Sequence, residues 1–217
     1  TAFGKITTSL VGDVFMPLIG YLIGGIDLAV GSTLAGVGTV LMAMIDTGDH
    51  GVLIRFGITG TPAFAIGIAA ALLAGVAIGA VNGLLITKGK VPPFIATLGV
   101  MNIIRSVAQY FTKSYSPTVP KAFEGIANTM ILGQRPMTIV YWLALAVIFY
   151  LVMKYTAFGR YVYATGSNER TTRLSGINTD KVKMKVYMIS GFVVAIAAVA
   201  QLSRLGGMDV ASAGSGY

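Results

Sequence analysis

The chain has 217 residues, of which 55% are hydrophobic and only 11% are charged. An ordinary soluble domain carries about 25% charged residues, so this composition excludes that class and predicts an integral membrane protein. The absence of cysteine excludes a disulfide framework and a cysteine metal site.

Six apolar segments follow one another with short polar stretches between them: 6–26, 28–45, 61–87, 91–110, 136–153 and 186–203. A helix that spans a bilayer needs about 20 mainly apolar residues. These segments are too long and too uniformly apolar to be the alternating strands of a membrane barrel. We therefore expect an all-α, polytopic protein in which residues 1–217 form a single transmembrane domain.

The first forty apolar residues raise a question of topology. One helix over 6–45 would extend about 60 Å, which is twice the hydrocarbon core. We expect either two crossings or one broken and tilted crossing. The chain begins at Thr1 rather than at methionine and stops at Tyr217 among small residues, so we expect an interior portion of a longer protein.

A carboxylate, Asp27, interrupts this apolar region inside the stretch GGIDLAVGS at residues 24–32. An ionised aspartate at the bilayer centre costs about 2.5 to 3.5 kcal/mol on insertion scales. Two interpretations remain open. Asp27 either caps the helix that follows, by accepting bonds from free backbone N–H groups, or lines a polar passage.

Small residues recur at intervals of four along the third segment, at Gly67, Ala71, Gly75, Gly79 and Gly83. Such a ridge lets a neighbouring helix approach to backbone contact, so tight helix packing is the expected role. The alternative is that this ridge lines a passage whose width changes during transport.

Two further polar residues lie in apolar segments. Asn82 lies on the third segment, and Arg105 lies on the fourth, which we expect to begin at the helix-compatible pair Pro92 and Pro93. Arg105 either pairs with an acid, faces a watery cavity or extends to the outer interface. Our hypothesis is that Asp27, Asn82 and Arg105 line or brace a central passage.

Seven of the 16 basic residues lie in one stretch, opposed only by Glu169 and Asp180: Lys154, Arg160, Arg170, Arg173, Lys181, Lys183 and Lys185. The positive-inside rule places this loop in the cytoplasm. Because consecutive loops lie on alternate sides of the membrane, counting back from this loop places Lys88 and Lys90 on the cytoplasmic side as well. This concentration of charge indicates anionic lipid and a cytoplasmic partner rather than nucleic acid.

The basic loop contains the pattern of a short capped helix over 169–175. Asn168 can cap it, Glu169 suits its first turn, Arg173 suits its last turn, and Gly176 suits a left-handed terminator. The helix is either a surface element lying on lipid headgroups or a docking element for a cytoplasmic partner.

Enzyme activity has little support in this sequence. The chain has no phosphate-binding loop of the Gly-Lys-Ser/Thr type, so we expect no ATP hydrolysis by this chain alone. The only histidine, His50, lies in an apparently external loop, which disfavours both an intramembrane protease and a multi-histidine metal site. We expect no catalytic, metal or cofactor site.

Three motifs carry a resemblance to a known family. They are GGIDLAVGS at 24–32, NGLLITKGKVPPFIATLG at 82–99, and FGRYVYATGSNER followed by LSGI within 158–177. Together they resemble the integral membrane permease subunits of bacterial ABC importers for monosaccharides of the ribose, xylose and arabinose type. Ala29 stands where serine is usual in the first motif.

The resemblance implies a function and a set of partners. It implies a permease dimer in the bacterial inner membrane, two cytoplasmic ABC ATPases that hold ATP and Mg²⁺, and a periplasmic sugar-binding protein. Residues 155–182 resemble the coupling loop, with Asn168, Glu169, Arg170, Arg173 and Gly176 as its site residues. Several monosaccharides remain possible as substrates.

One part of the coupling loop departs from the family pattern. The Glu-Ala-Ala core of related permeases falls on Arg170, Thr171 and Thr172 in this chain. The main alternative function is an ion- or proton-coupled secondary transporter of a small polar solute, which predicts inverted repeats. A membrane enzyme or a purely structural membrane protein is a more distant alternative.

Overall fold

The structure is a computed structural model that describes residues 27–46, 51–112, 119–123 and 137–206. The helices of this part of the chain are α3 (Val30–Ile45), η2 (Ile54–Phe56), α4 (Thr61–Thr87), α5 (Pro93–Thr112), α7 (Met137–Tyr155), α8 (Ala157–Ser167), α9 (Glu169–Leu174) and α10 (Thr179–Leu205). The described residues contain no strand, so the expected all-α class is confirmed.

Within the described residues, three helices are long and apolar enough to cross a membrane: Thr61–Thr87, Pro93–Phe111 and Thr179–Leu205. The pair Ile139–Tyr155 and Ala157–Ser167, bent by 77°, provides a fourth span if it is counted as one broken crossing. The polytopic class is therefore confirmed. The expected segment 6–26 lies outside the described residues.

Two elements differ from the expected apolar segments. α3 has 16 residues and is therefore about 24 Å long, which is shorter than the hydrocarbon core. α10 begins at Thr179 rather than at residue 186, because the side chain of Asn178 caps it by accepting a bond from the Lys181 N–H (3.0 Å). The polar turns at the start of α10 form part of the helix.

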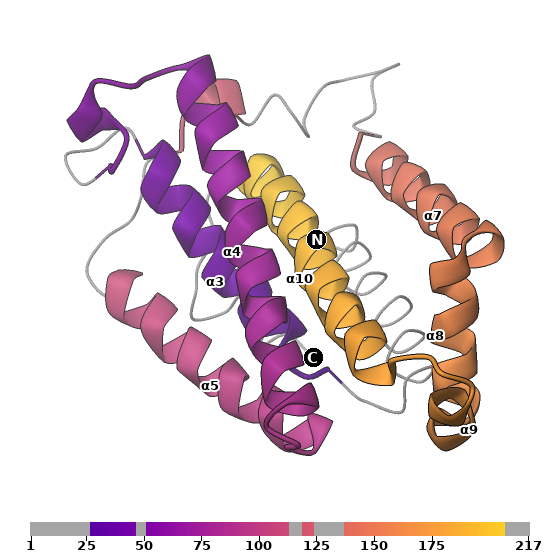
Figure 1. The fold of residues 1–217 in the computed structure, drawn as a ribbon. Coiled ribbons are helices and arrows are strands. Elements are labelled where there is room, and N and C mark those ends of the chain that lie inside the picture. The colour runs from indigo at the N-terminus through magenta and orange to yellow at the C-terminus, as the bar shows by residue number, and fades with distance from the viewer. Residues whose placement is uncertain (1–26, 47–50, 113–118, 124–136, 207–217) are drawn as a thin grey trace.

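The core lies between α3, α4 and α10, with α4 and α10 running side by side (Figure 1). Leu41 and Met42 of α3 are fully buried in it with Ala198 and Leu202 of α10. α5 packs on the outer side of α3, where the side chain of Ile104 covers Gly36. Ala108 of α5 and the fully buried Phe123 complete this core.

The small residues of α4 pack against two helices, α3 and α10. Gly67 faces Leu41 and Ile45 of α3, whereas Gly75 and Gly79 face the backbone of α10. A Cβ on Gly75 would lie 2.7 Å from the Ala195 Cβ and would also overlap a carbonyl oxygen of α10. The ridge is therefore filled by two neighbouring helices along its length.

Candidate functional site

Three consecutive helices at one end of the molecule each begin with a side-chain cap. Thr156 accepts a bond from the Gly159 N–H before α8 (3.2 Å), and Asn168 accepts one from the Thr171 N–H before α9 (3.0 Å). Asn178 does the same before α10. A cap of this kind contributes about 1 kcal/mol and fixes where the helix starts.

α9 ends at Leu174 rather than at Ser175, and Gly176 follows it in the left-handed conformation with φ +82°. The Gly176 N–H donates to the Arg173 carbonyl (3.1 Å), and the Ile177 N–H donates to the Thr172 carbonyl (3.3 Å). These bonds close the helix in the way expected for a glycine terminator.

A buried threonine fixes α9 on α8. The Thr172 hydroxyl lies 2.8 Å from the Ala164 carbonyl and 2.8 Å from the Asn168 carbonyl. The residue is only 5% exposed, so its position is set by packing as well as by these bonds. One face of the short helix is therefore held against its neighbour.

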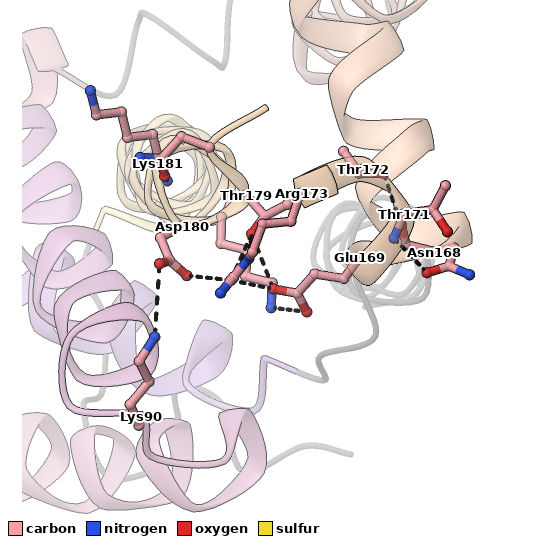
Figure 2. Close-up of polar contacts among 11 residues, drawn as sticks. Lys90, Asn168, Glu169, Thr171, Thr172, Arg173, Thr179, Asp180 and Lys181 are labelled. Carbon is pink, nitrogen blue, oxygen red and sulfur yellow. Dashed lines mark hydrogen bonds and ion pairs between the residues drawn. The ribbon is translucent and has the colours of Figure 1, made fainter. Parts of the chain in front are cut away.

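Glu169 joins α9 to α10 through both of its carboxylate oxygens. Oε2 accepts a bond from the Lys183 Nζ (2.7 Å), and Oε1 accepts bonds from the Arg173 guanidinium and the Thr179 hydroxyl (3.2 Å each). Figure 2 shows these contacts between the start of α9 and the first turn of α10. The two helices are thus linked directly.

Arg173 extends the same network. Its guanidinium donates to the Thr179 hydroxyl (2.9 Å from NH2) and to Asp180 Oδ1 (3.3 Å). The other Asp180 oxygen lies 3.8 Å from the Lys90 Nζ, on the turn between α4 and α5 (Figure 2). We call Lys90, Glu169, Arg173, Asp180 and Lys183 the inner charge cluster.

The inner charge cluster keeps Glu169 ionised. The bond from Lys183 holds the pKa of Glu169 below its ordinary value, and it outweighs a partial loss of water contact that acts in the opposite direction. The positive charges of Lys183 and Arg173 and the bond from Thr179 also lower this pKa. The ion pair with Lys183 is therefore present at neutral pH.

The opposite face of α9 points away from this network. Arg170 and Leu174 are four residues apart, so they share one face of the helix, and both are exposed. Leu174 is 84% exposed, which is high for a large apolar side chain on a short polar helix. We call Arg170 and Leu174 the outward face of α9.

Asp27 makes two hydrogen bonds. Its Oδ1 accepts from the Ala29 N–H (3.0 Å), just before α3, and its Oδ2 accepts from the Ser190 hydroxyl of α10 (3.3 Å). The first bond closes a local turn before α3, whose N-cap residue is Ala29 and has no side-chain cap bond. The second bond joins the start of α3 to the middle of α10.

Asn82 and Arg105 lie on two other elements. Asn82 on α4 is 2% exposed, and its Oδ1 has no hydrogen-bond partner among the described residues. Arg105 lies on α5 and is partly exposed. Asp27, Asn82 and Arg105 thus come from three elements: the residues before α3, α4 and α5. Asp27 is bonded to Ser190 of α10.

Sequence reasoning missed three residues that the structure connects to the site: Thr179, Lys183 and Ser190. Lys183 was read only as one member of a basic loop, and Ser190 only as part of an apolar segment. The opposite charges of Glu169 and Lys183 were the one available signal. The described residues contain no group of three or more His, Cys, Asp or Glu side chains that could hold a metal ion.

The long apolar helices define an integral membrane protein, and the comparisons with known proteins define its family. The chain belongs to the family described as "Branched-chain amino acid transport system / permease component", which matches residues 17–217. The resemblance to sugar import permeases is confirmed by curated relatives, although the family description names amino acids. No solved structure matches the chain.

Three relatives show how much of a permease the chain represents. It is 36% identical over 189 residues to the ribose import permease protein RbsC of Haemophilus influenzae, covering 85% of this chain and 54% of the relative. The RbsC of Escherichia coli K12 is 35% identical over 205 residues, covering 90% and 58%. The fructose import permease protein FrcC of Rhizobium meliloti is 31% identical over 199 residues, covering 87% and 51%. The chain spans little more than half the length of these relatives.

Proposed function

We propose that the chain is part of the membrane permease subunit of an ATP-driven monosaccharide importer in the bacterial inner membrane. The match to a permease family over residues 17–217 is the observation that carries this proposal. The relatives are named as import permeases for ribose or fructose, and this supports a monosaccharide as the substrate class.

The energy source in this proposal is a cytoplasmic ABC ATPase that holds ATP and Mg²⁺. α9 is the element that receives its motion, because the helix is capped, fixed on α8 and bonded to α10. Its outward face offers an exposed apolar side chain, Leu174, beside the cation Arg170. Such a face fits an apolar pocket on the ATPase with a carboxylate at its rim.

The passage for the sugar would lie between this subunit and a second permease subunit, with a periplasmic sugar-binding protein delivering the substrate. Asp27, Asn82 and Arg105 are our candidates for residues that line or brace it. Polar side chains inside apolar helices are costly unless they have such a role. The buried Oδ1 of Asn82, which has no hydrogen-bond partner in the part of the chain that the structure describes, supports this assignment most directly.

An ion- or proton-coupled transporter is the competing function. The family match and the sugar import relatives favour the ATP-driven importer over it. The decisive experiment reconstitutes the full-length permease with its ATPase in liposomes and measures uptake of radiolabelled D-ribose and D-fructose. We expect uptake of a sugar only with ATP and with the ATPase. Uptake driven by an ion gradient without ATP would refute the proposal.

A further inference from the structure

We propose that Lys183 is the positioning residue through which movement of α9 reaches the membrane helices. This inference rests on the proposed function, because it takes α9 as the element moved by the ATPase. It assigns to one lysine of the basic stretch a role that the exposed lysines beside it do not share. The argument depends on the ion pair with Glu169 and on the helix contacts that follow Lys183 along α10.

Among the four ion pairs of the inner charge cluster, Glu169 with Lys183 has the shortest distance, 2.7 Å, against 3.2 to 3.8 Å for the others. The side chain of Lys183 is 18% exposed, whereas that of Lys90 is 68% exposed and that of Arg173 is 53% exposed. Ion pairs that are partly shielded from water are screened less by salt, so this pair is the most persistent of the four.

The other pairs are less suited to pass movement between helices. Arg173 with Glu169 is a contact within α9 and does not reach another element. The ion pair of Arg173 with Asp180 does reach α10, but Asp180 lies in the first turn of that helix, and both side chains are about half exposed. Lys183 lies one turn further along α10, so its pair with Glu169 anchors the start of α9 to the body of α10.

Beyond Lys183, α10 is in backbone contact with α4. Tyr187 and Gly191 follow Lys183 at intervals of four, on the same face of the helix. The Tyr187 carbonyl lies against Gly79, and the Gly191 carbonyl lies against Gly75. A displacement of Lys183 along or across α10 is therefore transmitted to α4, because the backbones of the two helices are in direct contact at Gly75 and Gly79.

The experiment uses the full-length permease assembled with its ATPase in liposomes. The variant is Lys183→Met, which keeps the length of the side chain and removes its charge. Lys185→Met is the matched control, since Lys185 is exposed on the same turn of α10. The measurements are ATPase binding, ATP hydrolysis, and uptake of the sugar among D-ribose and D-fructose that the wild-type complex imports.

We expect Lys183→Met to bind the ATPase and hydrolyse ATP like wild type but to import about tenfold less sugar per ATP, within the usual range of coupling effects between sites. Lys185→Met should match the wild type. The exchanged pair, Glu169→Lys with Lys183→Glu, should recover part of the uptake. Wild-type uptake per ATP in Lys183→Met overturns the inference, and so does a loss of ATPase binding, which would give Lys183 a purely structural role.

A second readout needs no sugar. This chain contains no cysteine. In a full-length permease in which every other cysteine is replaced by serine, Thr171→Cys with Leu205→Cys introduces one spin-label site on α9, at an exposed residue outside the outward face, and one at the far end of α10. On addition of Mg-ATP and vanadate, the distribution of distances between the two labels should keep its width in the protein that retains Lys183. The distribution should broaden in the Lys183→Met variant. An equal response in both refutes the inference. Absence of ATP-driven uptake in the wild-type complex instead refutes the proposed function, so the two failures are distinguishable.

Discussion

Gly75 of α4 and Gly191 of α10 meet backbone to backbone, so that a Cβ on either residue would overlap the carbonyl oxygen of the other. Gly79 extends the contact, because its own Cβ would overlap the Tyr187 carbonyl. Close approach of this kind stabilises helix pairs in a membrane, where apolar side chains gain little by leaving lipid. α4 and α10 therefore behave as one unit.

The first prediction concerns this contact. Gly191→Ala should destabilise the full-length permease by about 1 to 3 kcal/mol, the usual cost of forcing an added group into a packed site. Gly99→Ala is the matched control, because a Cβ at Gly99 on α5 meets nothing within 4 Å. It should be neutral or slightly stabilising, since alanine favours helix. Thermal unfolding in detergent distinguishes them, and equal melting temperatures would contradict the packing argument.

The second prediction concerns the terminator of α9. Gly176 has φ +82° and free space around its Cβ position, so a substitution there is opposed by the backbone conformation alone. Gly176→Val should cost about 1 to 2 kcal/mol locally and uncouple sugar uptake from ATP hydrolysis. Gly176→Asn, which tolerates this conformation, should retain coupling. Uptake in vesicles by the valine variant at the wild-type level would show that the terminator is dispensable.

The third prediction concerns the bond between Asp27 and Ser190. A double-mutant cycle with Asp27→Ala and Ser190→Ala should give a coupling energy of about 0.5 to 1.5 kcal/mol, the net value of a typical hydrogen bond. Asp27→Ala alone should cost more than Ser190→Ala, because it also removes the bond from the Ala29 N–H. Denaturation in mild detergent measures each term, and strictly additive effects would show that the two residues do not interact.

The fourth prediction concerns acidity. The folded-state pKa of Glu169 lies below its ordinary value of 4.5, so its contribution is fully present above pH 4.5. That contribution is lost as the pH falls through the lower, folded-state pKa. A spin label on α9 should therefore become more mobile as the pH falls below 4.5 and through the lowered folded-state pKa of Glu169. Glu169→Gln should show high mobility at every pH; a sharp transition in this variant would assign the effect to another group.

The fifth prediction concerns the outward face of α9. Leu174→Asp should weaken binding of the ATPase about tenfold, because it removes an apolar anchor and places a carboxylate beside the expected carboxylate rim. Leu174→Met keeps an apolar side chain and should bind like wild type. Affinity measurements on the purified full-length permease and ATPase compare the variants. Unchanged affinity in Leu174→Asp would place the docking surface elsewhere.

The sequence predicted the elements whose signals are local. α4 has the expected bounds, Thr61–Thr87, because an uncharged apolar run ends at a lysine-containing turn. α9 was predicted to within one residue, since its cap and its terminator lie beside it. The start of α10 was missed, because its first turns are polar and a hydropathy criterion counts only the apolar part of a helix.

The contacts of the candidate site were not predictable from the sequence. Lys183 is 14 residues from Glu169, and Ser190 is 163 residues from Asp27. Each pair forms only because α10 crosses another element at a particular angle, and no short pattern contains that angle. The cytoplasmic placement of the seven basic residues stays a prediction from charge, whereas the pairing of Lys183 with Glu169 became visible only through its distance and its exposure.

α4 and α10 each have 27 residues and are therefore about 40 Å long, compared with a hydrocarbon core of about 30 Å. α10 has charged residues in its first turns, whereas α4 is uncharged throughout. The joined pair must consequently lean or locally thicken the bilayer. The length of the lipid acyl chains therefore affects the tilt of α4 and α10 in the membrane. The turnover rate of the transporter should consequently differ between thin and thick lipid bilayers.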